Sequence, residues 1–275
     1  MTQIDRARVI GRPRDVTEEE IAFYRKNGWV HLPRLIAPDT AASILDAIQA
    51  IASPESDAAD SPYATFGTLW KTMEDPSWRD ESLRDFAQSR EMGRVAADLQ
   101  GRPVRWYRDE ALCKMPASHD ASGPTPWHQD SPYNAFDRSG RPLIWLALKE
   151  VTPERGSMRF LSGSHLTGLL GRAFHDESGE CQRQVERLRK ELLESPPLHL
   201  EPGDATVHDG MTIHSAGANL TEDPRWSYVV QYFVADALYT GAMNRQTDRV
   251  THLEVGKPLC DCHFPITGVP RVRDL

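Results

Sequence analysis

Two histidines and one aspartate are the residues whose types and spacing could bind a catalytic metal. His128 and Asp130 stand two positions apart in the stretch Thr125-Pro126-Trp127-His128-Gln129-Asp130, and His214 follows much later. Two imidazoles and one carboxylate can take one face of an octahedral metal and leave the other positions open, the ligand set of non-haem Fe(II) oxygenases. The guanidinium of Arg225, downstream of His214, is suited to hold a second molecule that carries a carboxylate. These residues predict Fe(II) chemistry with O2 and an organic acid as co-substrate.

The His-x-acid pattern is weak evidence when it is taken alone. Ten histidines and 40 acidic residues among 275 predict about 1.5 chance matches to this pattern. His252-Leu253-Glu254 is such a second match. An isolated histidine is more often hydrogen-bonded or on the surface than bound to a metal, so the surroundings of His128 must carry the argument.

Elementary strand geometry suggests how the three side chains could meet. Side chains two residues apart in a β-strand point the same way. We therefore expect His128 and Asp130 to lie at the end of one strand and face one point, with Gln129 turned aside. We expect His214 to come from a distant strand that crosses a barrel.

Composition limits the class of protein. A chain of 275 residues can form one large domain or at most two small ones. Its net charge of -8 argues against broad nucleic-acid binding. No apolar run approaches a membrane span, and the N-terminus does not look like a signal peptide. We therefore expect a cytoplasmic protein with reduced thiols, and we interpret Cys260-Asp261-Cys262-His263, which lacks a partner pair, as structural or incidental.

The first hundred residues read mainly as helices. Residues 1–16 form a polar arm that we expect to be loosely held. Thr17 begins a helix with a capping box, and Gly28 ends it. A strand over 29–32 and helices over 38–51 and 82–99 complete a helical layer that spans mainly residues 17–101.

From residue 103 onward short strand-like runs replace the helices. They cover residues 104–114, 143–151, 157–161, 205–208, 212–216 and 226–235. One helix over 182–193 interrupts them. This order predicts a barrel or sandwich, mainly over 103–236, with a helical layer on one side. A C-terminal extension over 237–275 completes a single domain over 17–275.

Several further segments occur in a recognisable order. Gly156 begins a Gly-Ser-Met-Arg-Phe-Leu-Ser-Gly-Ser-His segment, Pro202-Gly203-Asp204 forms a turn, and His214-Ser215-Ala216-Gly217-Ala218-Asn219 follows. With the Thr-Pro-Trp-His-Gln-Asp motif, this order resembles the phytanoyl-CoA dioxygenase family of Fe(II)/2-oxoglutarate oxygenases over roughly residues 17–236. The resemblance implies a mainly β fold with flanking helices: a double-stranded β-helix (jelly-roll, cupin-like) core with an N-terminal helical layer.

The resemblance also implies roles for particular residues. His128, Asp130 and His214 would be the iron ligands, and Arg225 would bind the far carboxylate of 2-oxoglutarate. Three residues would line the co-substrate pocket: Thr125, Gln129 and Trp145. Core packing explains Trp145 equally well.

Four other positions qualify this picture. Ala216 and Met158 stand where the family often has small hydroxyl residues, which puts part of the co-substrate hydrogen bonding in doubt. His208 and His165 lie in family motifs, where packing or support of a ligand explains them better than metal binding.

The expected reaction is hydroxylation of an unactivated C–H bond of a small organic molecule, a specialised-metabolite intermediate. A carboxylate at Asp130 disfavours halogenation but leaves desaturation, cyclisation or another oxidative rearrangement open. The alternatives are a non-catalytic sensor or scaffold, a Zn-dependent cupin-like hydrolase or isomerase, and an oxygenase that acts on nucleic acid or protein side chains. We expect no nucleic-acid or membrane partner.

Overall fold

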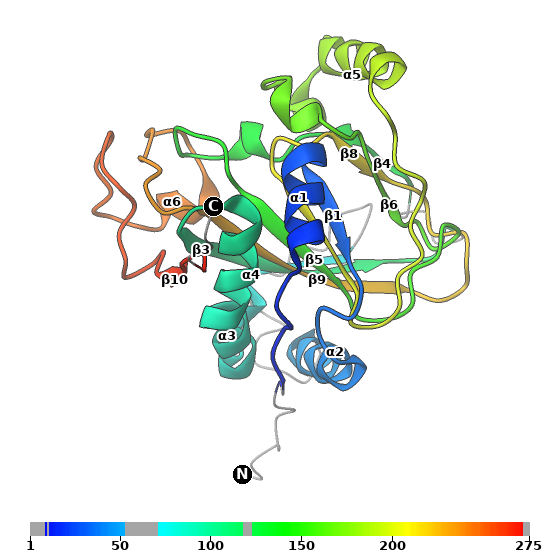
Figure 1. The fold of residues 1–275 in the computed structure, drawn as a ribbon, viewed down its shortest axis with the longest axis horizontal. Helices are drawn as coiled ribbons and strands as arrows, with labels where there is room; N and C mark the ends of the chain where they lie inside the picture. Colours follow the sequence, from blue (N-terminus) through cyan, green and yellow to red (C-terminus); the bar gives the residue numbers. More distant parts are fainter. Residues whose placement is uncertain (1–8, 10, 53–70, 118–122, 272–275) are drawn as a thin grey trace.

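The computed structural model describes residues 9, 11–52, 71–117 and 123–271. Its strands form two antiparallel sheets (Figure 1). The large sheet has the order β1 (Trp29–Leu32), β7 (Ala205–Asp209), β5 (Pro142–Ala147), β9 (Arg225–Val234), β3 (Val104–Lys114) and β10 (Ile266–Gly268), with β2 (Lys71–Glu74) also paired to β3. The small sheet has the order β4 (Thr125–His128), β8 (His214–Ala216) and β6 (Met158–Phe160).

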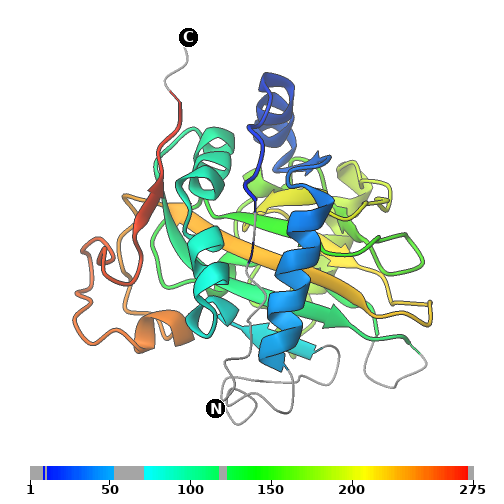
Figure 2. The same ribbon diagram turned by 90° about the horizontal axis from the view of Figure 1, so that it is seen from below.

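Helices cover one face of the large sheet. Figure 2 shows α2 (Pro38–Ala52), α3 (Glu81–Ala87) and α4 (Arg90–Gln100) along that face. The remaining helical segments are α1 (Glu18–Asn27), α5 (Glu180–Glu191), α6 (Arg245–Asp248) and four 3₁₀ turns, η1 (Pro76–Trp78), η2 (Ser131–Tyr133), η3 (Ser164–Leu166) and η4 (Ala173–His175). A curled antiparallel sheet opposite a smaller one, with flanking helices, is the predicted jelly-roll. Of the helices in the ranges given above, none combines the length and the apolarity that crossing a membrane requires.

Strand β9 contributes alternate side chains to the two faces of the large sheet. Its even-numbered residues Tyr228 and Val230 are buried in the core beneath the helices. Its odd-numbered residues Arg225, Val229 and Gln231 line a cavity on the opposite face. The two-residue repeat of a strand separates the apolar core from a partly polar cavity.

The helix predictions are confirmed at the first helix and wrong at the third. Thr17 accepts a hydrogen bond from the backbone of Glu20, and Gly28 ends α1 with a φ of 79°. The helix expected over 82–99 is two helices, because Ser89 adopts extended backbone and its hydroxyl accepts from Met92 N at 3.2 Å. A serine that caps a new helix stops the preceding one.

The expected segment boundaries also need correction. Strand β1 from the helical layer and β10 from the C-terminal extension both pair within the large sheet. The described end of the N-terminal arm is anchored: Arg14 N donates to Leu35 O at 2.8 Å, and Val16 is buried. Tertiary pairing therefore extends the jelly-roll beyond residues 103–236 on both sides.

Candidate active site

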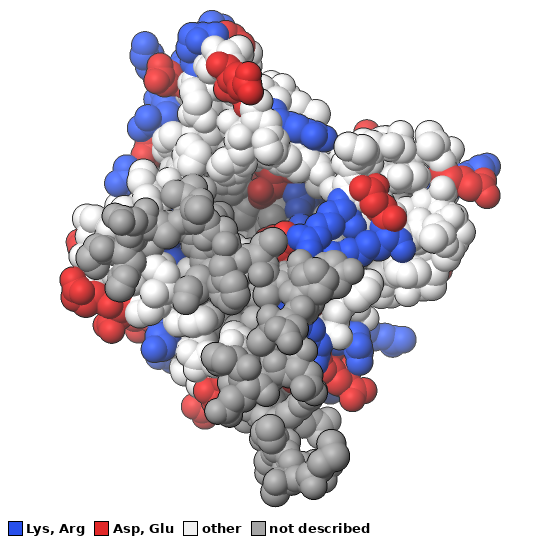
Figure 3. All heavy atoms as spheres, turned by 180° about the vertical axis from the view of Figure 1, so that it is seen from behind, with Lys and Arg blue, Asp and Glu red and all other residues white. Residues whose placement is uncertain are grey.

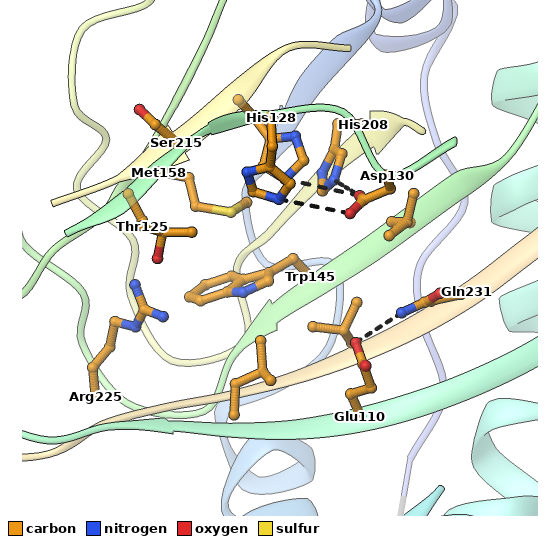
Figure 4. A pocket seen from close by; sticks show the side chains of 15 residues that line it. Glu110, Thr125, His128, Asp130, Trp145, Met158, His208, Ser215, Arg225 and Gln231 are labelled. Carbon is orange, nitrogen blue, oxygen red and sulfur yellow. Dashed lines mark hydrogen bonds and ion pairs between the residues drawn. The ribbon is translucent and has the colours of Figure 1, made fainter. Parts of the chain in front are cut away.

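A cavity lies between the two sheets. The large sheet contributes Glu110, Leu112, Leu143, Trp145, His208, Arg225, Val229 and Gln231. The small sheet and the turn after β4 contribute Thr125, His128, Asp130, Met158, His214, Ser215 and Ala216. The three predicted metal ligands and Arg225 therefore line the same cavity. Figure 4 shows His128, Asp130 and Arg225 there.

The predicted metal ligands converge, but for reasons that differ from the expectation. His128 ends β4 and stands directly opposite His214 of the neighbouring strand β8, so His214 does not come from a distant strand. Asp130 is not in the strand: its backbone is helical, with φ -85° and ψ -30°. Its N–H donates to Gly210 O at 2.9 Å, which fixes the turn that carries the carboxylate toward the histidines.

The three ligand atoms are close enough to share one ion. Nε2 of His128 lies 3.7 Å from Asp130 Oδ1, and Nε2 of His214 lies 3.8 Å from Asp130 Oδ2. Each residue offers one atom to a group in which all atoms lie within 4.8 Å of one another. The arrangement can therefore bind a metal through two nitrogens and one oxygen and leave its other positions open.

Backbone carbonyls orient both imidazoles. His128 Nδ1 lies 2.8 Å from Pro126 O, and His214 Nδ1 lies 3.0 Å from Thr212 O. A proton on Nδ1 that is donated to these carbonyls leaves the lone pair on Nε2, the atom that faces the cavity. The local chain path thus selects the tautomer that a metal requires.

The protonation states are also those of metal ligands. Burial, followed by the proximity of His214, lowers the pKa of His128 to about 4. Burial, followed by the proximity of His208, lowers the pKa of His214 to about 4. Burial alone would raise the pKa of Asp130, but His214 and a hydrogen bond from His208 hold it well below its usual range. At neutral pH the site presents two neutral imidazoles and a carboxylate.

His208 supports the aspartate. It is buried on β7, and its Nε2 lies 3.3 Å from Asp130 Oδ2. Figure 4 shows His208 and His128 facing Asp130. His165 lies elsewhere, with its Nε2 3.3 Å from Arg25 O. The structure thus places His208 as a positioning residue and His165 as a packing residue.

Arg225 lines the other end of the cavity, and a second buried cation, Lys114, lies beside it. Arg225 and Lys114 are each 1% exposed and are paired in register between β9 and β3. The guanidinium lies 5.3 Å from the centroid of the Trp145 ring, and Lys114 Nζ lies 3.5 Å from Thr125 Oγ1. Both cations donate to carbonyl oxygens, Arg225 to Gly156 and Lys114 to Gly217. Thr125 and Trp145 are therefore beside the Arg225 side chain.

No carboxylate in the described part of the chain forms an ion pair with either cation, and Arg225 Nε has no hydrogen-bond partner there. Burial lowers the pKa of Arg225 to about 10. Burial, followed by the charge of Arg225, lowers the pKa of Lys114 to about 7. Uncompensated buried charge is costly, so this end of the cavity favours an anion.

Lys114 was missed by the sequence reasoning, although a signal existed. Glu110, Leu112 and Lys114 alternate along β3, so all three fall on one face of a strand. A lysine on that face of a buried strand calls for an anionic partner.

Gln129 is the predicted site residue that does not line the cavity. Its Nε2 donates to Gly168 O at 2.9 Å and to Met211 O at 2.7 Å, and its Oε1 accepts from Leu170 N. These three bonds fasten the segment around Gly168 to the turn before β8. These bonds occupy the amide of Gln129 away from the cavity, so the geometry gives no support to the prediction that Gln129 contacts a co-substrate.

The two departures from the family pattern lie side by side. Ala216 pairs in register with both Thr125 and Met158, so one cross-strand row holds all three positions. Ser215 lines the same cavity. Thr125 is therefore the hydroxyl-bearing residue directly opposite Ala216.

A polar network forms another part of the cavity wall. Gln231 Nε2 donates to Glu110 Oε2 at 2.9 Å, Arg141 donates to Gln231, and Arg108 pairs with Glu110. Burial raises the pKa of Glu110, and the charge of Arg108 opposes that effect. None of these four residues was singled out from the sequence. Their side chains meet because strands β3, β5 and β9 pair in the large sheet.

A jelly-roll core with two histidines and one aspartate in the same cavity as a buried arginine is typical of iron- and 2-oxoglutarate-dependent dioxygenases. The sequence model of the phytanoyl-CoA dioxygenase (PhyH) family matches residues 24–227. The chain belongs to this family. Its cofactor is iron, and its co-substrates are 2-oxoglutarate and O2.

Individual relatives agree with that assignment. The methylphosphonate hydroxylase of Gimesia maris is 23% identical over 223 residues, which cover 79% of this chain and 80% of that protein. The epimerase SnoN from nogalamycin biosynthesis is 29% identical, with a TM-score of 0.74 over 91% of this chain and 97% of SnoN. SnoN is also known in complex with Fe3+, α-ketoglutarate and nogalamycin RO, at a TM-score of 0.70 and 28% identity over 91% of this chain and 98% of SnoN. The carbocyclase SnoK, 23% identical with a TM-score of 0.76 over 92% and 98%, has the same fold.

Proposed function

We propose that this dioxygenase hydroxylates an unactivated C–H bond of a small organic molecule of specialised metabolism, with His128, Asp130 and His214 as the iron ligands. One observation carries the proposal. The Nε2 atoms of both imidazoles and the carboxylate of Asp130 converge in one cavity whose other end holds the guanidinium of Arg225, which pairs with no carboxylate in the part of the chain that the structure describes. Metal ligands and an anion site in one cavity are what a keto diacid bound to iron requires.

The donor set fits the proposed metal and co-substrate. Imidazole and carboxylate suit Fe(II), and the open positions leave room for the keto acid end of 2-oxoglutarate. Bound iron, with 2-oxoglutarate and O2, supplies the oxidising power that converts a C–H bond to an alcohol and leaves succinate and CO2. The chain itself orients the ligands, holds the co-substrate and excludes water.

Arg225 binds the far carboxylate of 2-oxoglutarate in this proposal. Its Nε is unsatisfied, its guanidinium lies against Trp145, and Lys114 adds a second positive charge. Thr125 and Trp145 form walls of the same pocket. A Zn-dependent hydrolase or a non-catalytic scaffold would give no reason for two buried cations that pair with no carboxylate among the described residues.

The substrate side of the cavity favours a molecule with polar groups. Glu110 and Gln231 present a carboxylate and an amide to the cavity. Phe174 lies 4.7 Å from the His128 ring, between ring centroids, so an aromatic wall stands beside the metal ligands. The face in Figure 3 is hollowed near its centre, with basic and acidic side chains in and beside the hollow. These features support a mid-sized organic substrate.

Two of the similar structures are an epimerase and a carbocyclase. They support an alternative in which the same site ends in epimerisation or ring closure. The way in which the cavity holds the substrate relative to His128, Asp130 and His214 would decide between these outcomes and hydroxylation.

A screen for substrate-stimulated succinate release tests the proposed reaction. We expect polar, mid-sized natural products to raise succinate release above the uncoupled rate and to gain one oxygen atom by mass spectrometry. Product that lacks two hydrogens, or that has the mass of the substrate, would support the alternative outcome. Binding of iron and 2-oxoglutarate without turnover of any compound would favour the scaffold.

Lys114 should make 2-oxoglutarate binding depend on pH. Because its pKa is about 7 without the dianion, Lys114 is charged below neutral pH and neutral above it. A bound dianion favours the charged form, so affinity should fall as pH rises from 6 to 8.5. The expected change is roughly tenfold for each unit by which 2-oxoglutarate raises the lysine pKa. Calorimetric titration at several pH values measures it.

Lys114→Met is the matched variant for this measurement. It should bind 2-oxoglutarate more weakly at pH 6 and show a nearly flat affinity profile. A Lys114→Met protein whose 2-oxoglutarate affinity depends on pH as strongly as that of the wild type would show that another group titrates. Lys114 would then not stabilise the bound dianion.

A further inference from the structure

A second cluster of metal-ligating side chains lies outside the cavity. His252, Cys260, Cys262 and His263 belong to the segment between α6 and β10. Their ligand atoms all lie within 4.8 Å of one another. Two thiols and two imidazoles are the ligand set of closed, tetrahedral zinc sites.

Cys262 lies at the centre of this cluster. Its Sγ is 3.7 Å from His252 Nε2, 3.1 Å from His263 Nδ1 and 3.0 Å from Cys260 Sγ. The two sulfurs are not bonded, since a disulfide has a length of about 2.0 Å. Cys260 Sγ is also 3.7 Å from His263 Nδ1. Small movements of the four side chains would place all four ligand atoms around one ion.

The backbone that carries these ligands is fastened to the sheet. Phe264 N donates to Cys260 O at 3.0 Å and closes the turn that presents the two thiols. Arg105 of β3 donates to Phe264 O at 2.9 Å and pairs with Asp261. Phe264 is buried in a cluster of aromatic rings that includes Tyr107 and Phe233. A turn anchored in this way holds three of the four ligands in place before any metal arrives.

The four ligands are more exposed to solvent than Phe264, the buried residue that anchors their turn. Cys262 and His252 are exposed, and Cys260 and His263 are half-buried. An ion can therefore reach the cluster from solvent. His252 precedes Cys260 by eight residues, so its ligation would close the loop over residues 253–259.

We propose that His252, Cys260, Cys262 and His263 form a structural zinc site that fastens the C-terminal extension to the jelly-roll. Thiolate ligands favour Zn over the hard, oxygen-preferring cations, and four protein ligands leave no open position for catalysis. The site is separate from the iron site and does not depend on the proposed reaction. It gives a metal to the Cys-x-Cys-His motif, for which the sequence alone indicates a structural or incidental role, because His252 completes the ligand set.

The protonation of Cys262 is favourable for such a site. Hydrogen bonds from His252, then those with Cys260 and His263, lower the pKa of Cys262 to about 6. A thiolate is the form that binds metal. Burial raises the pKa of Cys260, and a bound cation would release its proton.

The Asp130→Ala protein tests the proposal, because its iron site is disabled. The full chain is purified under reducing conditions and its zinc is measured by elemental analysis. We expect about one zinc per chain. Co(II) in place of zinc should give the visible absorption of a tetrahedral ion with thiolate ligands. EDTA should lower the melting temperature.

Two variants in the Asp130→Ala background separate this site from other thiols. Cys260→Ser with Cys262→Ser should remove the zinc and the Co(II) absorption, whereas Cys181→Ser should retain both. His252→Asn keeps both thiols and should weaken zinc binding at least tenfold in a chelator competition.

A parent protein that binds no zinc and shows no thiolate absorption with Co(II) would overturn the proposal, whatever the folding of the variants. Zinc that persists in the double-serine variant would place the ion elsewhere. A Cys260–Cys262 disulfide that forms in preference to zinc binding would assign the pair to redox chemistry instead.

Discussion

Asp130→Ala is expected to abolish the weak visible charge-transfer band that the anaerobic protein forms with Fe(II) and 2-oxoglutarate. Asp130 is the only carboxylate of the three-residue group, and its oxygens lie 3.7 and 3.8 Å from the two imidazole nitrogens. Its removal leaves two neutral ligands and deprives His208 of its partner. Changes in groups that merely support a ligand cost about 10- to 100-fold in metal affinity, so loss of the ligand itself should exceed that. Succinate release should fall with the band.

Glu254→Ala is a matched control for this experiment. Glu254 belongs to the second His-x-acid match in the sequence and is exposed, away from the cavity. Its replacement should leave the band unchanged. A band that survives in Asp130→Ala would remove the aspartate from the metal site and return the zinc and scaffold alternatives to consideration. His128→Ala should behave as Asp130→Ala does.

Arg225→Ala should weaken 2-oxoglutarate binding far more than iron binding. A buried guanidinium that forms charge-assisted hydrogen bonds with a carboxylate is expected to contribute about 2–5 kcal/mol when it is truncated. That range corresponds to roughly 30- to 5000-fold in affinity. Arg225 is not among the three side chains that could hold iron, so Fe(II) affinity should change little.

Arg159→Ala and Arg225→Lys are the controls. Arg159 stands on β6 next to Met158 but is exposed and paired with Glu194, so its loss should have no effect on either affinity. Arg225→Lys keeps the charge without the planar fork and should bind 2-oxoglutarate with intermediate affinity. Equal losses of iron and 2-oxoglutarate affinity in Arg225→Ala would count against the assigned role, because they would indicate general damage to the cavity.

Local patterns predicted much of the fold. The capping box at Thr17, the glycine at position 28 and the strand over Val104–Lys114 all appear where the sequence places them. These signals depend on neighbouring residues, and neighbours are visible in a sequence. The split of the predicted helix at Ser89 shows the limit, because periodicity over 82–99 does not reveal which serine will cap a new helix.

The sequence pointed to four residues that line one cavity, but not to the geometry that brings them there. Residue types and motif order pointed to His128, Asp130, His214 and Arg225. The strand argument for Asp130 was nevertheless wrong, since contact with Gly210 holds the aspartate in a turn. Gln129 shared the motif with the ligands, yet its three hydrogen bonds belong to a neighbouring loop.

The sequence by itself determined the chemistry that this protein can support, because imidazole, carboxylate and guanidinium groups are properties of the residues. Only the tertiary structure decided which further residues join that chemistry. Register between β3 and β9 set Lys114 beside Arg225, and the fold of the C-terminal extension brought His252 to Cys260 and Cys262. Such partners are separated along the chain, and their meeting depends on strand pairing and packing, which no short window of sequence encodes.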